Sequence, residues 1–242
     1  MSKVYLLSMF RNSTPYMARY MDQFVLLRNL LERRGDELHA IWTEGDSVDQ
    51  TWMMLHKNMW HYGLNATILQ MPHGGLMRHD EHPDRFARLD IIWRAMFRRI
   101  PNDADTVVIV ESDLIWNPGD MVTLIDYSTC GDIVSPITWY GPLFYDTWAC
   151  RRNGVRFQNE QPIHPDLNGA DKWLELDSNG SCLVMPAHVA RENRTTPEDE
   201  LVGFCNNATA NGVRVWLVPE INIEHPMSLD SLFQRVTGQV SA

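Results

Sequence analysis

The chain has 242 residues, of which 44% are apolar and 21% charged, and its formal net charge is −10. This composition excludes a disordered protein, and the acidic balance argues against a broad basic face that grips polyanions. The four cysteines show no C-x-x-C pair or metal-ligand spacing, and a chain of this length is not a small disulfide scaffold, so we expect reduced, mostly packed thiols. No apolar run approaches the ~18 residues that span a bilayer. We therefore expect a soluble, cytoplasmic protein with one domain over residues 1–242.

Strand and helix patterns alternate through the first half of the chain. Short apolar runs predict strands at 4–10, 38–42, 66–71 and 107–110. Helical spacing of apolar residues predicts helices at 17–34, 51–62 and 84–99. This order implies right-handed crossovers and a mainly parallel α/β sheet flanked by helices.

The second half is less regular. Helices are predicted at 121–127 and from about 198 to 211, and strands at 133–139, 174–176, 182–185, 213–218 and 221–223. Residues 140–171 are rich in proline, glycine, asparagine and aromatic residues, which is typical of a long substrate-binding loop.

The strand at 107–110 runs directly into Glu111 and Asp113, which are spaced i, i+2. Open α/β sheets bind ligands outside the carboxyl ends of their strands. Carboxylate oxygens suit Mg²⁺ and Mn²⁺, which often share the phosphates of a nucleotide. An acidic loop without a ligand is the alternative interpretation of this triplet taken alone.

Three segments, in order along the chain, resemble the nucleotide-sugar-dependent glycosyltransferases of the GT-A fold. They are an E-G-D-S-x-D-x-T loop at 44–51, a D-x-D-like strand end at 110–118, and a set at 176–185, 198–205 and 211–216 that ends at His225. The third set is most similar to the fungal mannan-type (Anp-like) α-mannosyltransferases and their bacterial and phage relatives. The resemblance implies a GT-A domain with a nucleotide-binding half at 1–120 and an acceptor-binding half at 121–242.

The resemblance implies metal-dependent transfer of a sugar from a UDP- or GDP-sugar to a hydroxyl acceptor, a saccharide by default. Asp113, Glu111 and His225 would hold Mn²⁺ (or Mg²⁺), and an imidazole ligand suits Mn²⁺ better. The family has Asp where this chain has Glu111, so Glu111 can instead face the ribose or a metal-bound water. For His225, a surface position before proline is the alternative.

The resemblance also implies donor-binding residues at the strand ends and on the helix before the metal strand. The nucleotide-sugar-binding candidates are Phe10, Arg11, Glu44, Asp46, Arg88, Glu111 and Ser112. Asp46 can also cap the following helix, and Arg85 and Arg88 can lie on a solvated helix face.

Glu200 is the first catalytic candidate and Asp199 the second, because Glu200 matches an E-x-E-G-F-type position of the mannan family. In an inverting enzyme this residue would be the general base for the acceptor hydroxyl; in a retaining enzyme it would orient the sugar. The alternative is an acidic stretch that is favoured near a helix N-terminus.

Acceptor-binding candidates lie in and after the irregular loop. Tyr145, Asp146 and Trp148 combine an acid with aromatic rings that can stack on sugars, and the alternative is a plug in the core. Asn179 and Gly180 stand where the family has Gly-Gly, next to the donor sugar.

Three other functions remain open. A phage-type DNA glycosyltransferase acting on hydroxymethylated bases is supported by Arg151, Arg152 and Arg156, although the acidic balance opposes it. A nucleotidyltransferase would more naturally show a glycine-rich phosphate loop, and residues 10–14 contain no glycine. A non-catalytic sugar-binding module is the third.

Overall fold

The strand β4 (Thr106–Val110) lies at the centre of the computed structural model, which describes residues 1–72, 74, 83–167 and 172–226. Its side chains are buried throughout. Val107 and Ile109 join the core on one face of the sheet, and Val108 and Val110 join the core on the other. This alternation follows from the two-residue period of a strand, and burial on both faces explains why the strand is apolar at every position after Thr106.

The described elements follow the predicted order as far as β5 (Ile133–Tyr140). The strands are β1 (Lys3–Phe10), β2 (Glu37–Glu44), β3 (Ala66–Gln70), β4, β5 (Ile133–Tyr140), β6 (Leu143–Phe144), β7 (Arg151–Arg152), β8 (Val155–Arg156), β9 (Leu174–Leu176), β10 (Cys182–Pro186) and β11 (Val215–Glu224). The helices are α1 (Met17–Glu32), α2 (Thr51–Tyr62), α3 (Pro83–Phe97), α4 (Pro118–Ser128), α5 (Ala187–Glu192) and α6 (Leu201–Ala210), with a 3₁₀ turn at Pro165–Leu167.

The main sheet has the strand order β3-β2-β1-β4-β10-β5-β11-β9, with β6 beside β5. The strands β3, β2, β1 and β4 are parallel to one another, and β5 is parallel to β11. In contrast, β10 is antiparallel to both β4 and β5, and β9 is antiparallel to β11. The predicted mixed, mainly parallel α/β architecture is therefore confirmed.

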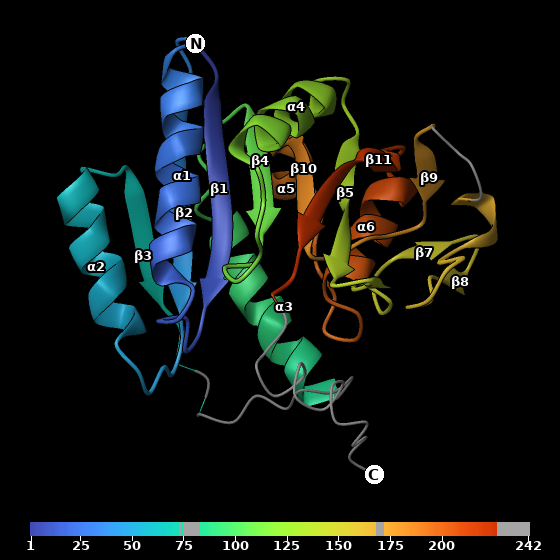
Figure 1. Cartoon of the computed structure of the whole chain (residues 1–242), viewed down its shortest axis with the longest axis horizontal. Coiled ribbons are helices and arrows are strands. Elements are labelled where there is room, and N and C mark those ends of the chain that lie inside the picture. The colour runs from blue at the N-terminus through green and yellow to red at the C-terminus, as the bar shows by residue number, and fades with distance from the viewer. Residues whose placement is uncertain (73, 75–82, 168–171, 227–242) are drawn as a thin grey trace.

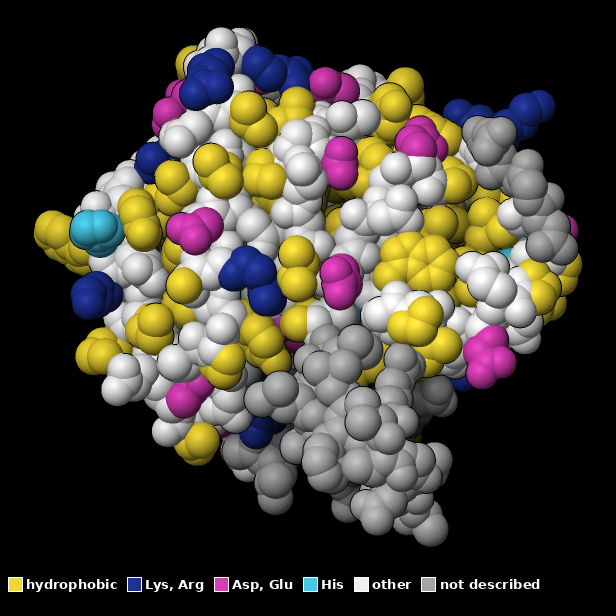
Figure 2. Space-filling model, in the orientation of Figure 1, with side chains coloured by type: hydrophobic (Ala, Val, Ile, Leu, Met, Phe, Trp, Pro, Cys, Tyr) yellow, Lys and Arg dark blue, Asp and Glu magenta, His cyan; other side chains and the backbone are white. Residues whose placement is uncertain are grey.

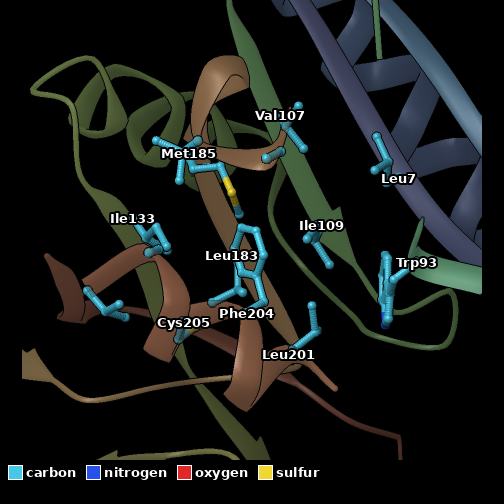
Figure 3. Close-up of a cluster of buried hydrophobic side chains, with 14 of the residues drawn as sticks. Leu7, Trp93, Val107, Ile109, Ile133, Leu183, Met185, Leu201, Phe204 and Cys205 are labelled. Carbon is cyan, nitrogen blue, oxygen red and sulfur yellow. The ribbon is translucent and has the colours of Figure 1, made fainter. Parts of the chain in front are cut away.

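Helices cover both faces of the sheet. Apolar side chains of α1, α2 and α4 pack on one face, and those of α3, α5 and α6 pack on the other. Figure 1 shows α1 and α4 in front of the strands, with α3, α5 and α6 behind. Figure 3 shows part of the core on the face covered by α3, α5 and α6. There, Trp93 of α3 and Leu201 and Phe204 of α6 lie around Ile109 and Leu183.

Several predicted boundaries differ from the structure. The helix expected at 121–127 starts earlier, at Pro118, because the Asn117 side chain accepts a hydrogen bond from the Gly119 N–H (2.7 Å) and caps it. The acidic stretch 198–200 precedes α6 rather than forming its first turn.

Three further differences concern the second half of the chain. The helix α5 was not predicted, and the two strands expected at 213–218 and 221–223 form the single strand β11, with an irregularity between Val218 and Asn222. The described part of the loop expected at 140–171, which ends at residue 167, contains three short strands and a 3₁₀ turn. Most of the residues between the predicted strand at 66–71 and the predicted helix at 84–99 lie outside the described residues.

Among the helices that the structure describes, none combines the length and apolar character that crossing a membrane requires. All four cysteines are free, and all except Cys130 are buried.

Candidate active site

The carboxyl ends of β1, β2 and β4 meet at one edge of the sheet because these three strands are parallel and adjacent. A pocket of about 260 Å³ opens there, which we call pocket A. Of the predicted donor-binding residues, it is lined by Phe10, Arg11, Glu44, Glu111 and Ser112. This sheet edge is therefore the position where an open α/β fold binds its ligand.

Two predicted donor-binding residues of the first strands have structural roles at this edge. Phe10 is only 2% exposed and packs edge-on against Tyr20, with ring centroids 4.8 Å apart. Glu44 is also buried, and its Oε1 atom accepts a hydrogen bond from the Ser47 N–H (3.0 Å), which holds the following loop. Asp46 has a positive φ of 53° in that loop and does not line pocket A.

Glu111, Asp113 and His225 form a cluster at the rim of pocket A. Their nearest ligand atoms all lie within 4.8 Å of one another, and His225 Nε2 lies 3.0 Å from Asp113 Oδ2. This proximity depends on an antiparallel bridge between Ile115 and Glu224, whose backbone N–H groups donate to each other's carbonyl oxygens at 2.7 and 2.9 Å. The bridge joins the loop after β4 to the end of β11 and so brings His225 to Asp113.

The imidazole of His225 is held in a defined orientation. Its ring stacks on Tyr145, with centroids 4.2 Å apart, and its backbone N–H donates to the Trp139 carbonyl at 2.7 Å. The Nδ1 atom lies 3.1 Å from the Pro226 carbonyl oxygen, to which it can only donate. In a neutral imidazole, Nε2 is then the nitrogen left to bind a cation, as in metal sites where the second ring nitrogen is fixed by a carbonyl.

The charges around Glu111 fit a bound cation. Burial, together with the nearby carboxylates of Asp113, Asp146 and Glu200, raises the pKa of Glu111 well above its ordinary value. A divalent cation would offset this repulsion, and two carboxylates with an imidazole are donors that Mn²⁺ accepts. The three predicted metal ligands are thus brought together with a donor chemistry that suits the predicted ion.

A second pocket, of about 270 Å³, adjoins the first, and we call it pocket B. Arg85, Glu111 and Tyr145 line both pockets. Among the described residues, Arg88 lines neither pocket, so the basic side chain of α3 at this site is Arg85. The sequence already indicated the position of Arg85. It lies four residues before Leu89 and eight before Trp93, which places all three on one helix face.

Glu200 lines pocket B and is held by the core. Its Oε1 atom accepts a hydrogen bond from Trp93 Nε1 at 2.6 Å. Figure 3 shows Trp93, and Leu201 that follows Glu200 in the sequence, within the buried cluster. Glu200 has a positive φ of 52°, which is uncommon for a residue other than glycine and marks local strain. Burial raises its pKa to about 7, although the Trp93 N–H acts in the opposite direction. Trp93 itself was not predicted as a site residue.

Asp199, the second catalytic candidate, also lines pocket B. Its Oδ1 atom lies 4.0 Å from the guanidinium of Arg151, and its side chain is more exposed than that of Arg151.

Asp146 has a structural role at the floor of pocket B. Its Oδ2 atom accepts hydrogen bonds from the backbone N–H groups of Gly180 (3.1 Å) and Ser181 (2.8 Å) and from the Ser181 hydroxyl (2.9 Å). Ser181 in turn accepts, through its carbonyl oxygen, the N–H of Glu111 at 3.2 Å. Asp146 therefore positions the backbone that receives the Glu111 N–H.

Asn179 and Gly180 are the two residues predicted at the Gly-Gly position of the mannan-type family. Gly180 lines pocket B, and Asn179 does not. Asn179 is 3% exposed, and its side-chain amide donates to the Ser135 hydroxyl at 2.9 Å. A Cβ atom added to Gly180 would lie 2.9 Å from Asp146 Oδ2 and 2.8 Å from Ala149 Cβ, so the close approach here requires glycine.

Trp148 lines pocket B with its ring faces already in contact with other side chains. It stacks on Phe86, with centroids 5.1 Å apart, and the guanidinium carbon of Arg156 lies 3.9 Å from its ring centroid. The ring is thus already in contact with two other side chains. Of the other two arginines in this region, Arg151 also lies near the Trp148 ring, whereas Arg152 pairs with Asp166 at 2.6 Å.

Comparison with known proteins relates this fold to solved structures. No protein-family model matches the chain, and no curated protein matches it in sequence. S. aureus TarS 1-349 superposes with a TM-score of 0.54 at 12% identity, over 93% of this chain and 60% of that one. The same protein in complex with UDP gives 0.53 at 12% identity, over 97% and 63%. The mannosyltransferase PcManGT from Pyrobaculum calidifontis, in complex with GDP-Man and Mn²⁺, gives 0.57 at 11% identity, over 99% and 65%.

This chain thus spans less than two thirds of the length of each of these proteins. At sequence identities of 11–12%, the structural similarity shows a shared fold and does not show a shared function. The predicted resemblance to the fungal mannan-type family stays a prediction. The structure and its neighbours agree on one conclusion: this chain has the mixed α/β fold of the GT-A glycosyltransferases.

Proposed function

We propose that this chain transfers a sugar from a nucleoside-diphosphate sugar to a hydroxyl acceptor, with a divalent cation held by Glu111, Asp113 and His225. The observation that carries the proposal is the position of this cluster: Glu111 lines both pockets, and its ligand atoms lie within 4.8 Å of those of Asp113 and His225. A donor in pocket A and an acceptor in pocket B would then meet beside the cation. The UDP and the GDP-Man with Mn²⁺ bound by structural neighbours support this class of donor.

Pocket A suits the nucleotide. All its lining residues except Tyr145 belong to residues 1–120, which supports this part of the chain as the nucleotide-binding half. Arg11 and Ser112 offer hydrogen-bond donors for phosphate or ribose, and Glu44 offers a carboxylate for base or ribose. Arg85, at the boundary of the two pockets, is suited to the diphosphate because a guanidinium can bind two phosphate oxygens at once.

The cation would act where negative charge develops. When bound, Mn²⁺ or Mg²⁺ at this cluster would stabilise the charge on the departing diphosphate. Tyr145 supports the cluster by stacking on His225, and the Glu111 carboxylate and burial raise the pKa of its hydroxyl, which keeps the phenol neutral. Asp146 fixes the backbone of Ser181 that receives the Glu111 N–H.

Glu200 is suited to act on the acceptor. It lines pocket B, and a carboxyl group with a pKa of about 7 exchanges its proton near neutral pH, as a general base does. The Trp93 N–H fixes one of its oxygens and leaves the other for the acceptor hydroxyl. Residues 145–149, 180–181 and 199–202 provide most of the pocket, which supports residues 121–242 as the acceptor-binding half.

Nucleotide binding tests the proposal directly. Titration of the purified chain with UDP and with GDP, each with and without Mn²⁺, should show one nucleotide that binds more tightly with the cation. Incubation with a panel of UDP- and GDP-sugars, and with either glucans or hydroxymethylated DNA, then identifies the donor and separates the two acceptor classes. Cation-independent binding of every nucleotide, together with no release of UDP or GDP from any sugar nucleotide, would refute the proposed function.

A further inference from the structure

Four arginines gather around a separate pocket at the far end of the sheet. This pocket, which we call the arginine pocket, has a volume of about 410 Å³ and is formed by the end of α3, the turn after it, and residues 190–194. Its polar lining residues are Arg94, Arg98, Arg191, Arg194, Asn102 and Asn193. Among the described residues, no aspartate or glutamate lines it.

The topology separates this pocket from the candidate active site. The turn after α3 leads into Thr106, the first residue of β4, whereas Glu111 follows its last residue. Pro186, which ends β10 just before α5, pairs with Thr106 in the antiparallel register. The arginine pocket thus lies at the amino end of β4 and the cation cluster at its carboxyl end, so that a ligand of one site would not occupy the other.

The guanidinium groups differ in their partners. Arg94 pairs with Asp90 at 2.9 Å and also donates to the Thr195 carbonyl at 3.2 Å. Arg191 donates to the Pro101 carbonyl at 2.8 Å, so it is oriented, but its charge is not neutralised by this contact. Arg98 and Arg194 are exposed and form no ion pair with any described residue.

This concentration of positive charge contrasts with the acidic net charge of the chain. The formal net charge is −10 with 21 lysines and arginines in total, of which four line this one pocket. On the face drawn in Figure 2, which is covered by α1 and α4, the lysine and arginine side chains are scattered among other types. Like charges held together at one pocket repel each other, and a bound anion would remove that cost.

We propose that the arginine pocket binds a phosphate group. Guanidinium groups match the geometry of phosphate oxygens through paired N–H donors, and the exposed Asn102 belongs to the same lining. The volume exceeds that of a single phosphate and leaves room for a second phosphate or an attached organic group. The phosphate can belong to a small molecule or to a phosphodiester polymer, and both share this chemistry.

Calorimetric titration of the full chain tests this site. The probes are inorganic phosphate, pyrophosphate and a single-stranded DNA oligonucleotide, each in buffer free of divalent cations. The test variant is Arg98→Ala with Arg194→Ala, and the matched control is Arg33→Ala with Arg99→Ala, which removes the same charge from exposed positions outside the pocket. We expect the test variant to bind the probes about tenfold more weakly or worse, because charge-assisted hydrogen bonds are lost, and the control to bind them within about twofold of the parent chain.

The two sources of phosphate give different patterns. Comparable binding of pyrophosphate and the oligonucleotide indicates a small phosphate ligand, whereas binding of the oligonucleotide alone indicates a phosphodiester polymer. Equal weakening in the test and control variants, or no saturable binding of any probe, overturns the proposal. Binding of UDP or GDP with Mn²⁺ by the test variant reports separately on the candidate active site, because that site does not include these arginines.

Discussion

The Nε2 atom of His225 lies 3.0 Å from the Oδ2 atom of Asp113, although Asp113 follows β4 and His225 follows β11. The contact joins two strand ends that are separated in the sheet by β10 and β5. A carboxylate and an imidazole at this distance form an ion pair when the histidine is protonated, and they can share a cation when it is neutral.

Replacement of Asp113 by asparagine, or of His225 by alanine, should abolish cation-dependent nucleotide binding and lower sugar transfer by about 100-fold or more, because a ligand of the proposed cation is lost. Titration of UDP or GDP in the presence and absence of Mn²⁺ measures the effect. Glu224→Gln is the matched control, since Glu224 is an exposed carboxylate next to His225 but outside the cluster. Equal losses in the control and in the cluster variants would contradict the assignment.

Arg85→Ala should weaken the binding of the nucleoside diphosphate by about tenfold or more, because a charge-assisted hydrogen bond to phosphate is worth roughly 1.5–3 kcal/mol. Arg88→Ala, on the same helix but outside both pockets, should bind within about twofold of the parent chain. The two variants should differ little in their binding of the corresponding nucleoside, which carries no phosphate. A larger effect at Arg88 than at Arg85 would show that the diphosphate lies elsewhere.

Glu200→Gln should lower sugar transfer by about 100-fold or more, because a general base is removed while the acceptor for Trp93 is kept. In the parent chain, activity should rise with pH through about 7, where Glu200 loses its proton. A rate profile over pH for both proteins measures this. A pH profile of the parent without an inflection near 7 would exclude Glu200 as the base.

Glu200→Gln should also change how the stability of the fold depends on pH. Because the pKa of Glu200 is raised from an ordinary 4.5 to about 7, the folded state favours its neutral form. The resulting contribution to stability is complete below pH 4.5 and is lost as the pH rises through 7. The glutamine in Glu200→Gln carries no charge at any pH. The melting temperature of this variant, relative to that of the parent chain, should therefore rise as the pH increases from 4.5 to 7. Thermal unfolding of both proteins at pH 5 and pH 8 measures this. The same difference in melting temperature at both pH values would contradict the raised pKa of Glu200.

Gly180→Ala should destabilise the fold by about 1–3 kcal/mol, the usual cost of forcing extra atoms into a packed site. The new Cβ atom would press on Asp146 and Ala149, and Asp146 could then no longer hold the N–H groups of Gly180 and Ser181. Urea unfolding measures the change in the free energy of unfolding. An unchanged midpoint and slope would show that Asp146 can move without loss of these hydrogen bonds.

Local patterns were sufficient for the centre of this fold. The apolar run of β4 is a consequence of burial on both faces, and the parallel order of the first four strands follows from the alternation of strands and helices. The carboxyl end of each such strand lies at the same edge, which is why Glu111 and Asp113 could be assigned to a ligand site. The position of His225 came from the family resemblance, and the structure brings it to the same cluster.

Long-range contacts account for what the sequence did not reveal. The antiparallel insertion of β10 between β4 and β5 depends on pairing between distant segments, which no local pattern encodes. The helix α5 has six residues and no side-chain cap at its start, so it lacks the usual signals of a helix. The role of Asp146 depends on the N–H groups of Gly180 and Ser181, more than thirty residues away.

The bridge between Ile115 and Glu224 has a consequence for assembly. Until β11 docks onto β5, His225 does not lie beside the loop after β4, so a partly folded chain would offer the proposed ion only the carboxylates of Glu111 and Asp113 from this cluster. A ligand that prefers the completed site adds its binding free energy to the stability of the native state, by mass action. Occupancy by the proposed ion would thereby stabilise the docking of β11 and couple the assembly of the candidate site to the completion of the sheet.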